Sequence, residues 1–546
     1  MTKTLLILLL CCFYGCKLQA QHTLDWLSTL GSGGEEIITK IEADNQGNVY
    51  GIGHFQDTIN GTVISNGFKD IFVCKYASNG SLLWLLKMGG TDEDLGKDLA
   101  LGEDGMLYIT GSYRNTFYYG NDSLINSGGT DAFVAKIDSQ GTILWVKQIG
   151  SSRSELGTAI TCDAFGNSYI GGTYEDSLWV DNQPLASYGA LNNFLLKLDA
   201  NGQLLWHNTL GTPTFDNIRD LELDAAGNLY LIGSFRDVAS SSLGQLFAYG
   251  NADVLLAKLD VNGQWFWWKK MGSTLPDFGF TLHIDGNALF LAGVFQDTAY
   301  FDATTKISEG EFDAFLAKCD AQGAIQWVQH VAGIDDSNPY DIKTLANNHI
   351  LLTGYFEGKT WSGQDSIASR NPRHVPSDLF IAEYDATGGL LYLNQLGSRG
   401  DDWGASLAIV DSNCFYLAGV FQDSVYFDST SLEISQSGSL DAFIAKWSPT
   451  IFTDLVITSN FKQAPVLLPN LVQKETVLSF ELQGSAPVTI SCYNRSGQCV
   501  ERIMHQQLCN GPQELTWNTK GLPAGLYYMT LQMNQAIVSL PFTIVR

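Results

Sequence analysis

Basic residues are scarce in this chain of 546 residues. Only 31 Lys and Arg stand against 57 Asp and Glu, and the formal net charge is −26. A surface this acidic argues against nucleic acid and anionic membranes as partners, because both carry negative charge themselves. It favours solubility, cations and basic partners without naming one.

Helical periodicity is missing as well, since no heptad or extended amphipathic-helix pattern occurs. Charged residues make up only 16% of the chain, whereas aromatic residues make up 12% and glycines number 55. This composition argues against disorder. It favours an all-β protein with many tight turns.

Long apolar runs are confined to the N-terminus. Residues 1–20 combine Lys3, the apolar core "LLILLLCCFYG" and the ending "KLQA", which is the pattern of a secretory signal peptide too short to span a bilayer. We expect cleavage after Ala20. Lipoprotein-type cleavage before Cys16 is the alternative, although Phe13 replaces the Leu usual at that distance. The sequence after residue 20 predicts an exported, soluble monomer without a membrane span.

Cysteines are too irregular for a disulfide framework, because the seven that follow the leader are an odd number. Four lie far apart in the chain and are typical of buried single thiols: Cys74, Cys162, Cys319 and Cys414. In "SCYNRSGQCV" a turn sets Cys492 and Cys499 opposite each other across a hairpin. We expect a disulfide there in an exported chain, with Cys509 as a competing partner.

Motifs of catalysis are missing too. The chain contains no G-x-S-x-G elbow, no H-E-x-x-H, no P-loop and no C-x-x-C, and its eight histidines are scattered. We therefore expect no enzymatic activity and no cofactor. Calcium is the one ion that the acidic positions described below leave open.

What the chain does contain is a repeat. One segment, "DAFVAKIDSQGTILW" (131–145), has counterparts 60 to 65 residues apart along most of the chain. The counterparts are "DIFVCKYASNGSLLW" (70–84), "NNFLLKLDANGQLLW" (192–206), "DVLLAKLDVNGQWFW" (253–267), "DAFLAKCDAQGAIQW" (313–327), "DLFIAEYDATGGLLY" (378–392) and the truncated "DAFIAKW" (441–447).

Each repeat contains four strand-like runs, separated by turns that an Asp or Asn opens and a Gly closes. Four antiparallel strands per unit predict a β-propeller blade, whereas the alternative, a solenoid, needs shorter units and capping ends. The repeated Lys, as in Lys136 opposite Trp145, is expected to pack on the indole with cation–π support. A ligand-binding role for this Lys is the alternative.

The first residues of the mature chain decide how the ring closes. The last copy ends after its third strand, and "LDWLSTLGS" (24–32) has the sequence of a fourth strand without a blade. Pairing the two ends closes a ring and removes the open sheet edges. The fold class predicted is thus all-β: a seven-bladed β-propeller closed by the N-terminal strand and followed by a small β-sandwich.

The repeats resemble the seven-bladed β-propeller repeats called SBBP. The resemblance covers about residues 24–447 and is carried by "DNQGNVYGIGHFQDT", "DAFGNSYIGGTYEDS" and "DAAGNLYLIGSFRDV", each followed by the repeated strand-three segment. The family is common in exported bacterial proteins. Membership implies the fold but no single activity.

The C-terminal eighty residues resemble the type A sorting domain of type IX secretion. The similarity is carried by "LPN", "VTISCYNRSGQCV", "NGPQELTW" and "LPAGLYYMTL", while Leu471 departs from the usual Pro-Asn-Pro start and Leu540 and Pro541 stand where a late Lys is usual. The resemblance implies contact with the type IX machinery, and release from or attachment to the surface of a Gram-negative, Bacteroidetes-type bacterium. The expected domains are a signal peptide (1–20), a propeller (21–447), a linker (448–466) and a sorting domain (467–546).

One face of the propeller carries the long inserts, and acids recur there. The acids that lead into strand one of successive blades are candidates for a ring at the channel mouth that binds a cation or a basic ligand: Asp94, Glu155, Asp216, Asp277 and Asp402. The alternative is that each carboxylate holds a turn by accepting backbone N–H groups.

These features predict an exported, non-catalytic binding module for an unknown glycan or protein. A propeller-based lyase or glycosidase is the enzymatic alternative, which requires acids or an Arg, His and Tyr set that converge at the channel. The structural alternative is a rigid surface protein that calcium braces.

Overall fold

In a computed structural model, residues 22–544 are described except for short gaps. The gaps are residues 32, 182, 186–190, 212–216, 364, 370–375, 411–413, 427–431, 435–438, 450–460, 469–470, 473, 495–498, 509, 523–524 and 534–535. The chain divides into two compact units, Thr23–Ser448 and a unit that contains Pro449–Arg546. The described residues form strands and turns, and no helix among them has the length and apolar character needed to cross a membrane.

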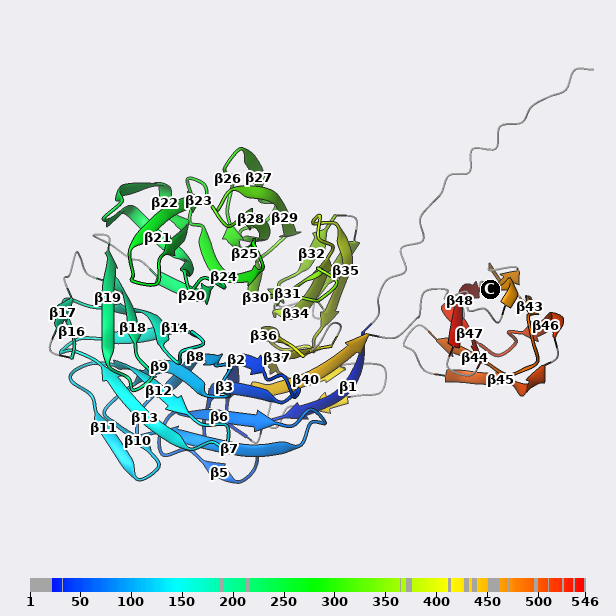
Figure 1. Cartoon of the computed structure of the whole chain (residues 1–546), viewed down its shortest axis with the longest axis horizontal. Coiled ribbons are helices and arrows are strands. Elements are labelled where there is room, and N and C mark those ends of the chain that lie inside the picture. The colour runs from blue at the N-terminus through cyan, green and yellow to red at the C-terminus, as the bar shows by residue number, and fades with distance from the viewer. Residues whose placement is uncertain are drawn as a thin grey trace, which may run out of the picture. The chain divides into compact units, whose positions relative to one another are not determined.

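The larger unit is a β-propeller in which sets of four antiparallel strands, called blades here, surround a central channel (Figure 1). Strand one of each blade lies innermost. These innermost strands are β2 (Glu36–Ala43), β8 (Leu95–Leu101), β14 (Glu155–Cys162), β20 (Asn217–Leu223), β24 (Phe278–Asp285), β30 (Ser337–Thr344) and β36 (Trp403–Ile409). They define blades 1 to 7 in chain order.

The next two strands of each blade are almost wholly buried in the sheet. Strand two is β3 (Val49–Phe55), β9 (Leu107–Tyr113), β15 (Ser168–Tyr174), β21 (Leu229–Ser241), β25 (Ala288–Phe295), β31 (Ile350–Phe356) or β37 (Phe415–Phe421). Strand three is β6 (Asp70–Tyr76), β12 (Asp131–Ile137), β18 (Asn192–Leu198), β22 (Gly244–Leu259), β28 (Asp313–Asp320), β34 (Asp378–Tyr384) or β40 (Asp441–Pro449).

The outermost strand completes each blade, and hairpins extend from the connection between strands two and three. The outer strands of blades 1 to 6 are β7 (Leu82–Gly89), β13 (Ile143–Ile149), β19 (Leu204–Gly211), β23 (Trp265–Met271), β29 (Ile325–Gly333) and β35 (Leu390–Leu396). The hairpins are β4–β5 (Thr58–Ile59, Val63–Ile64), β10–β11 (Thr116–Tyr119, Asp122–Ile125), β16–β17 (Leu178–Val180, Gln183–Leu185), β26–β27 (Thr298–Phe301, Thr304–Ile307), β32–β33 (Lys359–Ser362, Asp365–Ala368) and β38–β39 (Ser424–Tyr426, Leu432–Ile434). In blade 4 the long strands β21 and β22 form this extension themselves.

The two ends of the propeller sequence meet in one blade. β1 (His22–Thr29) pairs with β40 in the sheet that also contains β37 and β36. Just beyond β1, the Leu30 amide donates to the Ala442 carbonyl at 2.9 Å. This is the pairing that the truncated last repeat predicts, and it gives blade 7 its outer strand from the N-terminus.

Each outer-strand Trp fastens its blade to the next one. Trp84 Nε1 donates to the Ser139 carbonyl at 3.2 Å, and the indole lies against Gly141, where a Cβ would come within 3.0 Å of the ring. Gly141 has φ 84°, so a side chain there would suffer both backbone strain and a clash with Trp84. The repeated G-x-x-x-W spacing therefore encodes contacts between blades rather than within one.

The repeated Lys supports the same junction but not in the way expected. Lys136 does lie opposite Trp145 in the register, yet its ammonium lies over the ring of Tyr108 on strand two, 5.0 Å from the centroid. Lys75 lies over Tyr50 at 4.6 Å in the same manner. Lys136 Nζ also donates to the Ala200 carbonyl of the next blade at 3.4 Å. The cation–π partner is thus the strand-two aromatic ring, not the indole.

The smaller unit contains two sheets that share one hydrophobic core. The first is β41 (Phe461–Leu468), β43 (Glu475–Leu482) and β46 (Gly511–Asn518), and the second is β42 (Leu471–Val472), β48 (Ala536–Ile544), β47 (Gly525–Met533), β44 (Ala486–Asn494) and β45 (Cys499–Leu508). Leu478 and Phe480 of the first sheet pack in one cluster with Ile490 and Met529 of the second.

The hairpin of β44 and β45 contains the two cysteines that the sequence places opposite each other. Cys492 lies opposite Glu501, and Cys499 lies opposite Tyr493, with a bulge between the two pairs. The Cys492 side chain lies in the hydrophobic core. A disulfide between Cys492 and Cys499 stays a prediction.

We predict that Trp26→Ala destabilises the propeller as much as Trp84→Ala does, by about 2 kcal/mol or more in the free energy of unfolding. The reason is that Trp26 occupies the same place between blades: its Nε1 donates to the Ser78 carbonyl at 3.0 Å, and its ring lies against Gly80. Denaturant unfolding of both variants measures this. A near-zero cost for Trp26→Ala beside a large cost for Trp84→Ala would show that the N-terminal strand is not part of the ring.

Candidate functional site

The acids predicted to ring the channel mouth are buried at the junctions between blades. Asp94, Glu155 and Asp277 are 0% exposed and Asp402 is 1% exposed, while Asp216 lies outside the described residues. Asp94 accepts backbone N–H groups from Gly90 at 2.6 Å and from Arg114 at 3.1 Å. Such carboxylates hold the loops at the start of strand one, so the geometry matches the turn-holding alternative rather than a ring open to solvent.

The channel itself is lined by other residues of the innermost strands. A β-bulge interrupts each of these strands at the same place, for example between Ile38 and Lys40 and between Gly96 and Asp98. The positions after the bulge form the middle row of the channel: Lys40, Asp98, Ala159, Asp220, Thr281, Asp341 and Ser406. Two residues further on lies the lower row: Glu42, Ala100, Thr161, Glu222, His283, Lys343 and Ala408.

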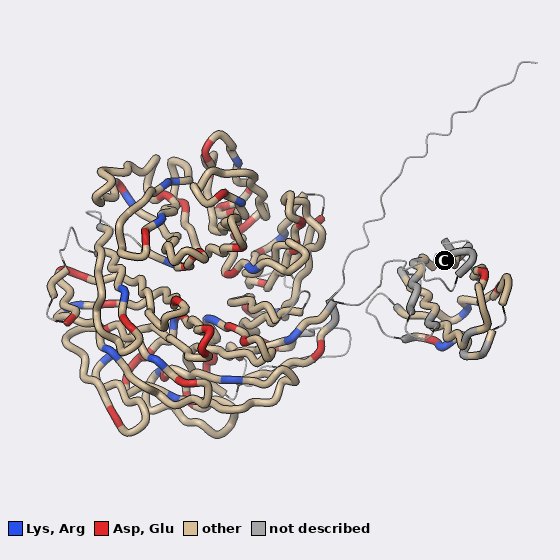
Figure 2. Tube along the Cα trace, in the orientation of Figure 1, with Lys and Arg blue, Asp and Glu red and all other residues tan. Residues whose placement is uncertain are grey.

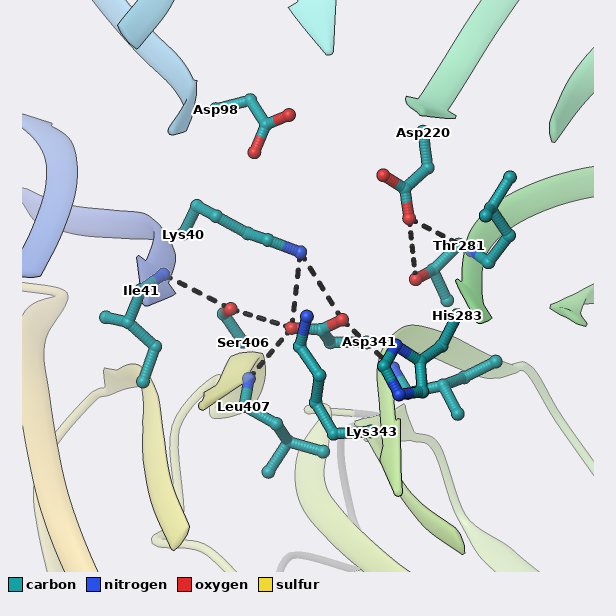
Figure 3. Close-up of polar contacts among 12 residues, drawn as sticks. Lys40, Ile41, Asp98, Asp220, Thr281, His283, Asp341, Lys343, Ser406 and Leu407 are labelled. Atoms are coloured by element: carbon teal, nitrogen blue, oxygen red, sulfur yellow. Dashed lines mark hydrogen bonds and ion pairs between the residues drawn. The ribbon is translucent and has the colours of Figure 1, made fainter. Parts of the chain in front are cut away.

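On the channel side of blade 7, two ion pairs join the innermost strands of blades 1 and 6. Lys40 Nζ of blade 1 lies 3.4 Å from Asp341 Oδ1 of blade 6 (Figure 3). Lys343 Nζ of blade 6 lies 3.3 Å from Glu42 Oε1 of blade 1. These pairs can form because blade 7 presents only the small Ser406 and Ala408 between them. Asp341 also accepts the Leu407 amide at 2.8 Å and the Ser406 hydroxyl at 2.7 Å. Although burial opposes its ionisation, Lys40 and Lys343 hold the pKa of Asp341 below its usual value.

On the channel side of blade 3, no ion pair joins the innermost strands of blades 2 and 4, which the structure describes throughout. The residues that face this side from blades 2 and 4, Asp98 and Asp220, both carry carboxylates and cannot pair with each other. A cavity of about 150 Å³ lies here, lined among others by Asp98, Thr161, Asp220 and Glu222. Burial, together with the charge of Asp220, raises the pKa of Asp98 to about 7, although Lys40 and two backbone amides oppose the shift.

His283 belongs to the lower row and bridges blades 4 and 6. Its Nδ1 lies 3.1 Å from Glu222 Oε1, and its Nε2 lies 3.0 Å from Thr344 Oγ1. Glu222 in turn accepts the Ile284 amide at 2.5 Å. The ring is therefore held on both sides, which orients it as a fixed polar group of the channel wall.

The residues within the bulges face the channel nearer to the insert-bearing face and differ in character. The Arg219 guanidinium lies 5.6 Å from the Phe280 ring centroid, and Phe280 lies 6.3 Å from Tyr340. Lys97 lies near them, and burial together with Arg219 lowers the pKa of Lys97. The channel thus carries cations and aromatic rings at this level, and more acids than lysines in the middle and lower rows.

Charged residues occur around the ring (Figure 2), and at the channel positions their type changes from blade to blade. Sequence reasoning missed them, because it looked for acids that repeat. The signal was available in the strand-one segments, where Lys40, Asp98, Asp220, Thr281 and Ser406 occupy one position of the repeat. Among the described residues, no group of three or more His, Cys, Asp or Glu is arranged to hold a metal ion.

No family model matches the chain. It is 29% identical over 447 residues to the regulatory protein FlaEY of Caulobacter vibrioides, covering 74% of this chain and 42% of that one. It is 19% identical over 525 residues to an uncharacterised WD repeat-containing protein of Acanthamoeba polyphaga mimivirus, covering 80% of this chain and 36% of that one. The chain thus spans less than half the length of these relatives.

Solved structures with detectable similarity include a puromycin hydrolase mutant, at TM-score 0.38 and 10% identity over 83% of this chain and 59% of that one. Apocarotenoid oxygenase of Synechocystis matches at TM-score 0.33 and 11% identity over 79% of this chain and 97% of that one. PorZ of Porphyromonas gingivalis, described as a surface component of the type IX secretion system, matches at TM-score 0.14 and 9% identity, over 95% and 100%. All three TM-scores are too low to support a functional argument.

We predict that Lys40→Met destabilises the propeller by about 2 kcal/mol or more, because it leaves the Asp341 charge, 2% exposed, without its ammonium partner. The matched variant Lys343→Met should cost less, because its partner Glu42 is 29% exposed and can be solvated. Denaturant unfolding measures both. Equal, small losses would show that the two pairs do not brace the ring.

Proposed function

We propose that this protein is an exported, non-catalytic binding module: a seven-bladed propeller that holds its ligand at the central channel. The observation that carries the proposal is the contrast between two sets of positions. The junction residues, such as Trp84, Gly141 and Lys136, repeat from blade to blade. The channel residues change from blade to blade.

This contrast favours binding over a purely structural role. A junction must be made in the same way around the ring, so its residues repeat. A surface that recognises one asymmetric ligand needs different groups at each blade. The channel meets that need with Lys97, Arg219 and Tyr340 at one level and with Asp98 and Glu222 below. These groups suit a polar ligand, either a glycan or a protein segment.

We predict that the double variant Asp98→Asn/Asp220→Asn loses at least 10-fold in affinity for the ligand, since it removes two of the carboxylates that line the cavity on the channel side of blade 3. The measurement is a glycan array and a pulldown with the leaderless chain, followed by titration of each hit. Asp138→Asn is the matched control, because Asp138 lies in an exposed turn and bonds only its own hairpin. Hits bound equally by all three proteins would place the site outside the channel.

A second candidate, a carbohydrate-active enzyme, is favoured by one observation. Asp98 and Asp220 are two channel carboxyls of which one has a pKa raised to about 7, the condition in which a carboxyl can act as an acid near neutral pH. Release of sugar fragments from a bound glycan separates the two functions. Calcium bracing, the structural candidate, is tested by comparing the melting temperature with and without chelator.

We further propose that residues 467–546 direct type IX secretion and that the protein acts at the cell surface or outside the cell. The support is the sequence resemblance of the C-terminal segment together with the two-sheet fold of that unit. Deleting residues 467–546 in a host with this secretion system should keep the propeller inside the cell, as judged by fractionation. The export of a truncated chain at normal levels would refute this role.

A further inference from the structure

At each junction between blades, two sets of acids that are far apart in the repeat come together. One is the Asp that begins strand three, and the other is the acid that leads into strand one of the next blade. At the first junction both lie against one glycine: a Cβ on Gly89 would lie 2.7 Å from Asp70 Oδ1 and 2.9 Å from Asp94 Oδ2. Asp70 and Asp94 are both 0% exposed.

The same arrangement recurs at other junctions. A Cβ on Gly272 would lie 2.7 Å from Asp277 Oδ2 and 3.2 Å from Asp253 Oδ1, and both carboxyls are 0% exposed. Asp131 and Glu155 form the corresponding pair at the second junction and are likewise 0% exposed. Two carboxyl groups are thus enclosed together where solvent cannot separate their charges.

In each of the described pairs, one carboxyl oxygen has no hydrogen-bond donor. Asp94 has an amide donor on each oxygen, from Gly90 and Arg114. Asp70 Oδ2 accepts the Asn66 amide at 2.8 Å, but Asp70 Oδ1 has no hydrogen-bond partner. The Oδ1 atoms of Asp131 and Asp253 are in the same situation.

Blades that depart from the pattern provide an internal comparison. At the junction of blades 5 and 6, Ser337 stands where the second acid is usual, and there both oxygens of Asp313 have donors, from the Glu309 amide at 2.9 Å and the Gly333 amide at 3.1 Å. At the junction of blades 3 and 4, Asn192 stands where the strand-three Asp is usual. At the first of these junctions, where one acid is missing, no oxygen is left without a donor.

We propose that the carboxyls of each paired junction share one proton, so that acidification tightens the contacts between blades. The proton on the strand-three Oδ1 turns that atom into a donor toward the neighbouring carboxylate, which the backbone amides keep ionised. Every oxygen of the pair then has a partner, and the junction carries one negative charge instead of two. A metal ion fits less well, because amide donors already occupy the second carboxylate.

The other charged groups near the first junction do not remove the need for this proton. Lys87 Nζ lies 3.7 Å from Asp70 Oδ2, the oxygen that already accepts the Asn66 amide. Asp92 adds negative charge near Asp94, and the buried Tyr113 lies within the field of Asp94 and Asp131. Burial, with a smaller contribution from the charge of the partner acid, raises the pKa of Asp94, Glu155 and Asp277 to about 7. Burial raises the pKa of Asp253 to about 6.

The sign of the pH effect follows from these directions. A carboxyl that titrates near 4 in the unfolded chain and near 7 in the folded one binds more protons when folded over that interval. Stability is therefore fully present below about pH 4 and falls as the pH rises toward 7. Because the pair titrates as a unit, the proton belongs to the pair rather than to one residue.

The test replaces one acid by Asn, the residue that blade 3 carries at this position as Asn192. Asp70→Asn and Asp253→Asn supply an N–H where the proton would be, so each should raise the melting temperature by about 2 °C at about pH 8 and change it little at about pH 5. The matched control Asp313→Asn, where no proton is shared, should lower the melting temperature at both pH values.

Infrared spectroscopy and the addition of Ca²⁺ test the shared proton independently of the melting temperature of the variants. The infrared carbonyl band of protonated carboxyl groups should be present at neutral pH and weaker in Asp70→Asn, even if that variant is less stable. An unchanged band, or an unchanged slope of melting temperature against pH, would overturn the shared proton. Stabilisation of the natural chain, but not of Asp70→Asn, by added Ca²⁺ would show that the junction holds a metal ion instead.

Discussion

At four of the junctions between blades, one carbonyl carries the contact. In the turn between strands three and four, a backbone oxygen accepts hydrogen bonds from the Trp and the Lys of the preceding blade; Ser139, for example, accepts from Trp84 at 3.2 Å and from Lys75 at 3.4 Å. The turn glycine lets the indole approach closely enough to bury its face. Because one turn receives both donors, the blade-to-blade distance is set by the backbone rather than by flexible side chains.

Among the described residues, the junction of blades 6 and 7 lacks this carbonyl, and two residues of blade 6 depart from the repeat there. Blade 7 takes its outer strand from the N-terminus, so it has no turn between strands three and four to offer blade 6. Blade 6 accordingly carries Glu383 and Tyr392 where other blades carry Lys and Trp, and Glu383 binds His349 Nδ1 at 2.6 Å. The ion pairs of Lys40 and Lys343 link blade 6 to blade 1 at this same part of the ring, on the channel side.

The sequence is informative about the fold because the residues that make the junctions lie at short, recurring spacings in the repeat. The spacing from Asp to Gly to Trp is short and recurs, so the strands, the turns and the closing role of residues 24–32 could be predicted. The partner of the repeated Lys could not, because Tyr108 lies on a different strand, beyond the reach of a hairpin pattern. The register at Cys492 and Cys499 could not be predicted either, because a bulge in the hairpin shifts it.

The candidate site was less accessible to sequence reasoning, for a physical cause. Acids that repeat, such as Asp94 and Glu155, are needed to hold backbone amides at every junction, and this need buries them. Groups that can meet a ligand must instead lie on the channel side of strand one, where the repeat imposes little beyond the bulge. Function in such a ring is thus expected at the positions that the repeat leaves free. At Asp98 and Asp220 these positions place two like charges across a gap that no side chain of blade 3 fills.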